Sequence, residues 1–332
     1  MDSTERKAFW DTLCSIRGNT PEQTQMLASA IKLPRSICRF RTVSESSLTQ
    51  LQENKLYYSS ADYYDDPFDT FIHFDYARIK ALYSFLCDSI GSNNPDILKA
   101  IEVIGSIIGI TGEQYLKNLK ESSFDITILP DRIKHIRTII QKNLFSICFC
   151  DDIKNETLWL KYANNYKGFA LVYDIHDQNT FLCGKEEICK NCRSRVENPS
   201  VYPVYYTEDS YDATQFALAC LLWGESQSLP PQIMKLSYST VMWEAERISL
   251  IKKKCHEYDN EWRMIRPSMA PDRTCIKMKP QKVILGLRMP EYERLLVISA
   301  AKVAGIDLIE KQYIDESDCL SSKPISINHR QD

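Results

Sequence analysis

The chain has little glycine, with ten residues among 332, and it has no Gly-rich loop of the kind that cradles phosphates. This absence argues against a Rossmann or P-loop nucleotide site. No apolar run approaches the roughly 20 residues that a membrane-spanning helix needs, and the charged N-terminus lacks the apolar core of a signal peptide. These features predict a cytoplasmic protein with no membrane partner.

The net charge is also small. The formal charge of −3, with acidic and basic residues interspersed, gives no electrostatic basis for binding bulk DNA or an anionic membrane. A hydrophobic content of 44% is ordinary for a packed protein, and the length suits one large domain or two small ones. Partners must therefore be inferred from local motifs.

Cysteine, by contrast, is abundant, with 12 residues. Most stand singly in apolar runs, where a reduced thiol behaves as a small hydrophobic group. The exception is a cysteine-containing loop at 176–199, where a C-x-x-C pair, a third cysteine and an upstream histidine can supply a structural zinc site. The four candidate ligands are His176, Cys183, Cys189 and Cys192. A polar loop with incidental thiols is the alternative interpretation.

Hydrophobic periodicity divides the chain into three parts. Residues 1–35 carry apolar side chains at helical spacing and predict two N-terminal docking helices. Residues 36–315 predict a single α+β domain of catalytic type, and residues 316–332 are polar and predict a flexible tail. The strand pattern stops before residues 76–143 and resumes after them, so this segment is predicted to be a helical insertion in one sheet.

The predicted core is a bent, mostly antiparallel sheet with flanking helices. The predicted strands are at 36–43, 55–60, 144–150, 169–173, 200–207, 261–266, 275–278, 282–287 and 307–313. The predicted helices beyond the N-terminal pair are at 44–54, 76–91, 96–109, 112–121, 131–143, 211–226, 229–254 and 290–304. Three consecutive lysines at 252–254 are interpreted as the solvated end of the helix at 229–254.

One stretch, 145–175, organises the rest of the chain. A buried strand is followed by a polar turn, a short helix that Asn155 can cap, and Gly168 before the next strand. This order brings Ser146, Trp159 and Tyr162 close together and predicts the wall of a pocket. A purely structural core is the alternative.

Charged residues repeat at two-residue spacing on two predicted strands. Asp259 and Glu261 therefore face the same way, and Arg263 lies on their side, where it can pair with either acid. An ordinary salt bridge is the alternative interpretation of these three residues. Arg39 and Arg41 likewise share one face of the first strand.

Three spaced motifs resemble the signatures of a bacterial family of domains of unknown function. They are Tyr-Asp-Asp-Pro-Phe-Asp at 64–69, Leu-Trp-x-x-Tyr-Ala running to Lys-Gly-Phe at 158–169, and Asp-x-Glu-Trp-Arg at 259–263, followed by Val-Ile-Leu-Gly at 283–286. The chain departs from the family pattern at Asp65, His256 and Asp259, where the family has Asn, Trp and Glu.

The order of elements is similar, more distantly, to that of ADP-ribosyltransferases. Those enzymes have an Arg or His on a first strand, a Ser-x-Ser-like strand leading into a short helix with an aromatic residue, and a glutamate on a late strand. Arg39 or Arg41, Ser146 with Cys148, and Glu261 match in order. The resemblance implies an ADP-ribosyltransferase-like fold and NAD as a substrate.

The resemblance also implies roles for individual residues. Glu261 would hold a ribose hydroxyl and stabilise the oxocarbenium-like transition state, while Asp259 would orient or deprotonate the acceptor. Arg39, in preference to Arg41, would bind the pyrophosphate, and Ser146 would hydrogen-bond the ribose or support Glu261. The aromatic candidates for nucleotide contact are Tyr58, Trp159 and Tyr162.

The implied function is an ADP-ribosyltransferase or an NAD glycohydrolase, acting as a toxin or anti-phage defence effector. Its partners would be a nucleotide ligand, an unknown macromolecular target and a regulatory or antitoxin protein.

Two other classes of function use the same residues. Asp65, Asp66 and Asp69 with Glu261 can gather a divalent cation for a metal-dependent nuclease or phosphoesterase, although Asp66 before a proline is also typical of a turn. The third class is a non-catalytic nucleotide-sensing or interaction module. Chelator-sensitive cleavage of nucleic acid would favour the metal enzyme, and thermal stabilisation by NAD without nicotinamide release would favour the module.

Overall fold

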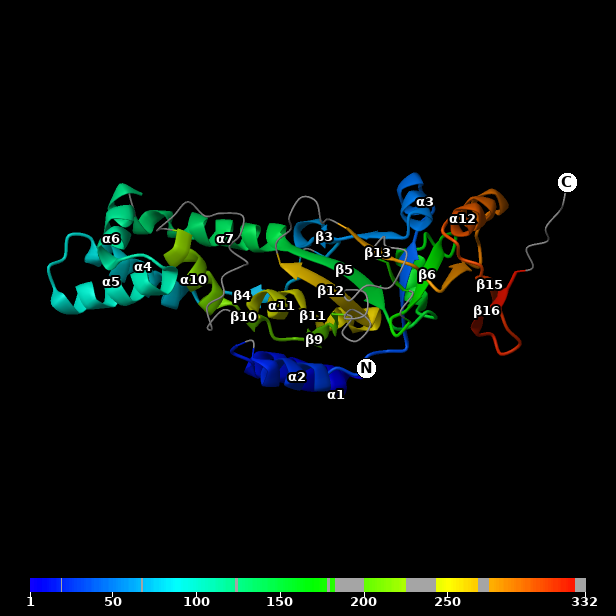
Figure 1. Cartoon of the computed structure of the whole chain (residues 1–332), viewed down its shortest axis with the longest axis horizontal. Coiled ribbons are helices and arrows are strands. Elements are labelled where there is room, and N and C mark those ends of the chain that lie inside the picture. Colours follow the sequence, from blue (N-terminus) through cyan, green and yellow to red (C-terminus); the bar gives the residue numbers. More distant parts are fainter. Residues whose placement is uncertain are drawn as a thin grey trace.

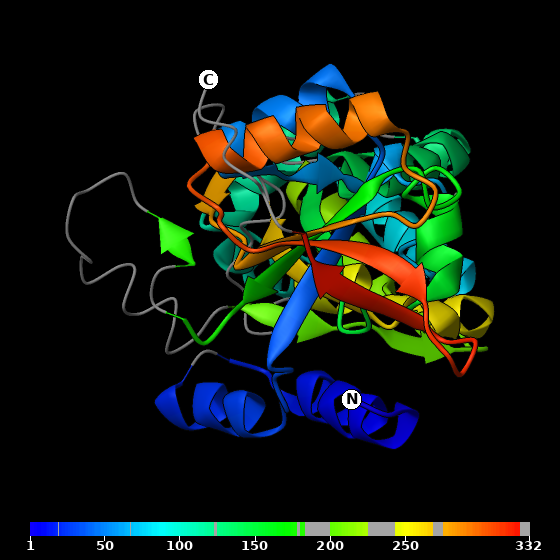
Figure 2. The ribbon, with the colours of Figure 1, turned by 90° about the vertical axis from the view of Figure 1, so that its right-hand side faces the viewer.

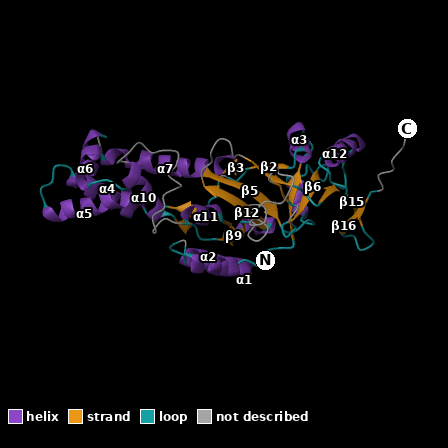
Figure 3. Ribbon diagram, viewed as in Figure 1, coloured by secondary structure: helices purple, strands orange, loops and turns teal. Residues whose placement is uncertain are grey.

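The protein is described from a computed structural model covering residues 1–18, 20–66, 68–122, 125–177, 180–182, 200–224, 243–267 and 275–325. The fold is α+β, with a helical lobe at one end and a strand-rich part at the centre and the other end (Figure 1; Figure 3).

The helices, including short 3₁₀ turns labelled η, are α1 (Ser3–Ser15), α2 (Pro21–Ser29), α3 (Glu45–Gln52), η1 (Ala61–Tyr63), α4 (Tyr76–Ser89), α5 (Pro95–Ile108), α6 (Gly112–Glu121), η2 (Ile126–Ile128), α7 (Leu129–Asn143), α8 (Glu156–Lys161), α10 (Thr214–Gly224), α11 (Glu244–Ser249), η4 (Lys254–Asp259) and α12 (Glu291–Val303). The strands are β1 (Ser36–Arg41), β2 (Lys55–Tyr57), β3 (Ser59–Ser60), β4 (Ile72–His73), β5 (Leu144–Cys150), β6 (Phe169–Asp174), β7 (Phe181–Leu182), β8 (Val201–Pro203), β9 (Tyr205–Thr207), β10 (Tyr211–Asp212), β11 (Ile251–Lys253), β12 (Glu261–Pro267), β13 (Cys275–Met278), β14 (Lys282–Leu285), β15 (Ile309–Ile314) and β16 (Leu320–Pro324).

The main sheet is open and mostly antiparallel, which confirms the coarse sequence prediction. Within the described ranges its order is β16-β15-β14-β6-β1-β5-β12-β8, with β3 paired to β5, and β14 with β15 is its parallel pair. Figure 2 shows α12 and α3 on one side of the molecule and α1 and α2 on the opposite side. Smaller sheets join β2 with β13 and β7, β4 with β10, and β9 with β11.

The sheet is joined weakly at its middle. β5 pairs with β12 along its whole length, from Glu261 opposite Cys150 to Pro267 opposite Leu144. In the part of the chain described, β1 meets β5 only where Cys38 lies opposite Cys150. The two halves of the sheet therefore have room to separate beyond this pair, and a cavity lies between them.

The N-terminal helix α1 packs on the strand-rich part, below the strands in Figure 1. Its buried Arg6 donates hydrogen bonds to the carbonyl oxygens of Val204 at 2.9 Å and Glu261 at 2.8 Å. The same guanidinium lies 5.6 Å from the ring centroids of both Tyr206 and Trp262. Helix α1 thus holds the start of β12 and the adjacent Val204 through two backbone contacts.

Helix α8 begins and ends as the sequence predicts. The side chain of Asn155 accepts a hydrogen bond from the Leu158 amide at 3.1 Å and caps the helix. Position 168, just before β6, requires glycine because a Cβ there would lie 2.1 Å from the carbonyl oxygen of Arg41. A Cβ on Gly286 would lie 2.6 Å from the Gly168 carbonyl oxygen, so these two glycines allow three segments of backbone to pack closely.

The four helices predicted at 76–143 are present as α4 to α7. Leu86, Ile101, Tyr115 and Leu119 form a separate buried cluster in this lobe, and α10 packs against it through Leu222. The lobe therefore has apolar contacts of its own, apart from those of the sheets.

Several sequence predictions were wrong. The tail at 316–332 was predicted to be flexible, but Leu320–Pro324 forms β16, whose Ser322 hydroxyl donates to Glu310 on β15 at 2.5 Å. The predicted helix at 211–226 begins with β10, and the helix predicted at 229–254 is, where described, α11 followed by β11.

Two predicted strands are each divided between sheets. Tyr58 separates β2 from β3, and Val204 separates β8 from β9. The Val204 amide donates a hydrogen bond to the Glu261 carbonyl at 3.0 Å, one position beyond the last β8–β12 pair, before β9 joins β11 in another sheet.

Among the helices described, none has both the length and the apolar content needed to cross a bilayer.

Candidate active site

A cavity of about 230 Å³ lies between β1 and the β5–β12 pair, with α8 and the loop after η1 completing its walls. Its lining includes Arg39, Ser146, Tyr162, Asp259 and Glu261, which come from four segments of the chain. The structure therefore brings together the arginine, serine and carboxylates that the sequence singled out.

The pairing of β5 with β12 places their side chains on one face. Glu261 lies opposite Cys150, Arg263 opposite Cys148, and Ile265 opposite Ser146. Paired residues of an antiparallel ladder point to the same side, so Glu261 shares its face with Cys148 and Ser146. The sequence predicted this alternation but not the register between the two strands.

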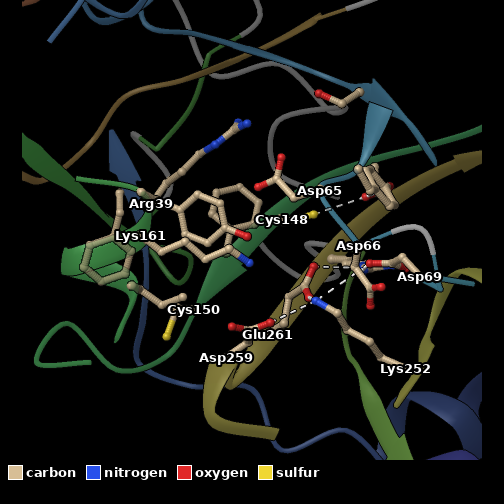
Figure 4. Close-up of a pocket in the computed structure, with 18 of the residues that line it drawn as sticks. Arg39, Asp65, Asp66, Asp69, Cys148, Cys150, Lys161, Lys252, Asp259 and Glu261 are labelled. Atoms are coloured by element: carbon tan, nitrogen blue, oxygen red, sulfur yellow. Dashed lines mark hydrogen bonds and ion pairs between the residues drawn. The ribbon is translucent and has the colours of Figure 1, made fainter. Parts of the chain in front are cut away.

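Three carboxylates and two cations form a buried cluster on the floor of the cavity (Figure 4). Arg263 bonds both oxygens of Asp69, at 2.9 and 2.7 Å, and Glu261 Oε1 at 2.7 Å. Lys252 Nζ lies 2.9 Å from Asp259 Oδ2, 3.1 Å from Glu261 Oε2 and 3.7 Å from Asp69 Oδ2. The cluster carries one net negative charge, and Asp259 Oδ1 has no hydrogen-bond partner among the residues described.

The opposite charges of the cluster stabilise one another in their ionised forms. Burial alone would raise the pKa of Glu261, but Arg263 and Lys252 outweigh it and hold that pKa well below its usual range. Burial opposes the charge of Lys252, yet Glu261 and Asp69 raise the pKa of its ammonium overall. Both groups are therefore ionised at neutral pH.

The opposite side of the cavity carries Arg39, together with Arg41 on the same strand (Figure 4 labels Arg39). Burial lowers the pKa of Arg39, and burial followed by the charge of Arg39 lowers the pKa of Arg41 to about 9. Arg41 donates to Gln50 at 2.9 Å, whereas Arg39 Nη1 is buried without a hydrogen-bond partner in the described structure. No carboxylate among the described residues pairs with Arg39 or Arg41, so the two guanidinium groups form an electropositive end of the cavity.

Ser146 lines the same cavity from β5. Its hydroxyl is 2.5 Å from the Tyr64 hydroxyl and 3.4 Å from Cys148 Sγ. Burial and the charge of Glu261 raise the pKa of the Cys148 thiol to about 12, so Cys148 stays protonated and is a poor nucleophile.

The three aromatic candidates have different positions. Tyr162 lines the cavity and is partly exposed. Trp159 is fully buried instead, with its ring stacked on Tyr166 at 6.0 Å and its indole bonded to the Ile153 carbonyl, so it supports the wall from behind. Tyr58 lies outside the cavity lining, with Arg266 5.6 Å from its ring centroid. Trp159 and Tyr58 were predicted to contact a nucleotide, but neither lines the cavity.

The acids proposed for a divalent cation are largely occupied by protein cations. Asp69 is bonded by Arg263, and Asp66 Oδ2 lies 3.0 Å from His256 Nε2. Lys252 stands between the carboxylates where a metal ion would have to bind. Among the residues described, no three His, Cys, Asp or Glu side chains are grouped to hold a metal.

The predicted zinc site falls largely outside the described residues. Cys183, Cys189 and Cys192 belong to the range 183–199, which is not described. His176 is described, and its Nε2 lies 3.2 Å from the Pro34 carbonyl oxygen. The zinc site therefore stays a prediction.

Lys252 and Tyr64 are site residues that the sequence interpretation missed. Lys252 was taken for an exposed helix end, but β11 pairs with β9 and turns its side chain inward. The available signal was the apolar pair Leu250 and Ile251 directly before it, which is not typical of a solvated helix end.

Searches among family models, curated proteins and solved structures found no match to this chain. The family resemblance and the ADP-ribosyltransferase-like fold therefore stay predictions.

Proposed function

We propose that the protein cleaves the bond between nicotinamide and ribose in NAD, transferring ADP-ribose to water or to a macromolecular acceptor. The observation that carries the proposal is the distribution of charge in one cavity. A floor with one net negative charge, containing Glu261, faces an electropositive side containing Arg39 and Arg41. NAD has the complementary pattern, with a cationic nicotinamide ring at one end and a doubly negative diphosphate beyond its ribose.

The size of the cavity limits what it can enclose. Ligand pockets commonly measure about 300–1,000 Å³. At about 230 Å³, this cavity can enclose the reacting end of the dinucleotide but not the whole molecule. The diphosphate would then lie toward the arginines at the side of the cavity.

The residues can each supply a step of the reaction. When the C–N bond breaks, its electron pair leaves with nicotinamide, and positive charge develops on the ribose. The ionised Glu261 can stabilise that charge and accept a hydrogen bond from a ribose hydroxyl, because a carboxylate has about four acceptor positions and Arg263, Lys252 and Cys148 use three of them. Asp259 Oδ1, which has no partner in the described structure, can take the proton of the attacking water or acceptor hydroxyl.

The proposal is tested with NAD labelled on its adenylate half, following both nicotinamide release and label transfer. We expect turnover by the wild type and a loss of roughly 10²- to 10³-fold in Glu261→Gln, the range seen when an electrostatic stabiliser of a transition state is removed. Glu310→Gln is the matched control, because Glu310 is also a buried glutamate in an ion pair, with Lys282 at 2.9 Å on the far side of the sheet.

Folded wild-type protein that neither releases nicotinamide nor transfers label would refute the enzyme activity. If NAD raised the thermal midpoint of the same protein, a non-catalytic nucleotide-binding module would be favoured instead. A role as a toxin or defence effector, with a regulatory or antitoxin partner, is supported only by the resemblance.

A further inference from the structure

Lys252 is a buried lysine whose ammonium contacts only acidic groups within the described ion pairs. Its side chain is 6% exposed, and the three carboxylates around it come from the loop before β4, from η4 and from β12. An ammonium in such a place is retained only when its charge is balanced, because burial of an unpaired charge is costly. The role of Lys252 is therefore its effect on those carboxylates.

The neighbouring cation cannot replace Lys252. Arg263 directs Nε to Glu261, Nη1 to Asp69 and the Ser249 carbonyl, and Nη2 to Asp69. None of these four bonds is made to Asp259, whose described ion pair is with Lys252 alone. Without Lys252, two adjacent carboxylates, Asp259 and Glu261, would face each other with a single cation shared among three acids.

We propose that Lys252 is a positioning residue, which balances the charges of Asp259 and Glu261 and holds their carboxylates side by side on the cavity floor. The roles of those two carboxylates in catalysis rest on the proposed function, but the effect of Lys252 on their ionisation does not. Like charges that share a site raise the pKa of one of them, commonly by one unit or more, and Lys252 prevents this rise.

The other titratable groups near the ammonium do not supply the missing charge. Arg263 is already committed, and the remaining side chains that sense Lys252 are the neutral phenols Tyr162, Tyr206 and Tyr258, whose pKa values are raised chiefly by burial. His256 pairs with Asp66 and not with this cluster.

The test compares wild type, Lys252→Met, Lys252→Arg and the double variant Lys252→Met with Asp259→Asn. Lys254→Met is the matched control, because Lys254 is exposed and two positions along the chain. The first measurement is the urea midpoint of each protein from pH 5 to pH 8, which requires no ligand and no activity.

The expected sign follows from proton linkage. In the wild type, the pKa of Glu261 is lowered, so its stabilisation is complete above the ordinary value near 4.5 and is lost only as the pH falls below that value. In Lys252→Met, one carboxyl of the pair has a raised pKa in the folded protein. Its ionisation therefore lowers the free energy of unfolding most at pH 8, and this loss declines as the pH falls. The deficit in the midpoint of Lys252→Met should therefore shrink toward pH 5, whereas Lys254→Met should show no such trend.

The variants have distinct expected outcomes. Lys252→Arg should restore most of the wild-type pH dependence, and the double variant should be more stable than Lys252→Met at pH 8, because it removes one charge of each sign. A deficit that stays constant from pH 5 to pH 8 would overturn the proposal in favour of a packing role. If Lys252→Met does not fold, failure of the double variant to recover folding would overturn it equally.

The second measurement uses nicotinamide release as a function of pH. The acid limb of the profile should move upward by about one pH unit or more in Lys252→Met and stay in place in Lys254→Met. As the pH falls, Lys252→Met should therefore lose activity while its stability deficit becomes smaller. A loss of packing would not produce these two opposite trends. If the wild type releases no nicotinamide, the proposed function fails, but the urea series still decides the role of Lys252.

Discussion

Arg39 illustrates a conflict between stability and ligand binding at a single residue. Its Nη1 is buried with no partner in the described structure, and burial lowers its pKa, so the guanidinium is held at a cost to the free protein. Unsatisfied buried polar groups cost about 1–3 kcal/mol. Such a cost is typical of a residue retained for its ligand.

Replacing Arg39 by methionine should therefore raise the free energy of unfolding, by about 1 kcal/mol, while weakening the binding of NAD at least about tenfold through the loss of a charge-assisted contact. Urea unfolding and isothermal titration would measure the two effects. Arg35→Met, at an exposed position just before β1, is the control and should change neither. A clear loss of stability in Arg39→Met would show that the guanidinium is structural.

At the scale of elements, β16 covers the edge of β15, which was predicted from the sequence to be the last strand. It pairs antiparallel with β15 over five residues and contributes the buried Leu320. Without it, β15 would present unpaired backbone groups and Glu310 would lose a hydrogen bond from Ser322. Exposed edges promote association between chains.

Truncation after Asp318 should therefore lower the thermal midpoint and increase the fraction of large species in size-exclusion chromatography. Truncation after Ile325 removes only residues outside the described structure and is the control. Equal midpoints for the two truncations would show that β16 contributes nothing to the fold.

The success of the sequence predictions differs between elements for physical reasons. The unit from β5 through α8 to β6 was predictable because its signals are local: an apolar run, the Asn155 cap and Gly168. β16 was missed because a short edge strand rich in serine and lysine has the composition of a tail. The breaks at Tyr58 and Val204 depend on partners far away in sequence, which periodicity cannot register.

The same distinction applies to the site. The shared face of Asp259, Glu261 and Arg263 follows from two-residue spacing, and Arg39 and Ser146 line the same cavity. Lys252 could not be placed, because its burial depends on the pairing of β11 with β9. Trp159 was placed in the right element but on the wrong side of it, since helical spacing alone does not say which face meets the ligand.

At the scale of the whole molecule, the helical lobe has a buried cluster that is separate from those of the sheets. Leu119 is fully buried in this cluster, and leucine-to-alanine changes at such positions cost about 2–5 kcal/mol. Cooperative units of a protein can open separately when few contacts link them.

Leu119→Ala should accordingly increase hydrogen exchange in α5 and α6 and leave exchange in β5 and β12 close to that of the wild type. Nicotinamide release should also be unchanged, because the cavity is lined by other elements. Leu98→Ala, at an exposed position of α5, is the control. Faster exchange throughout the sheet would show that the lobe and the sheet unfold as one unit.

The opposite charges on the two sides of the cavity also affect how a molecule enters it. They set up an electric field that runs from β1 toward β12, and this field exerts a torque on any guest whose own ends differ in charge. Such a guest is turned before it makes contact, so one orientation is favoured on the way in and its reverse is repelled.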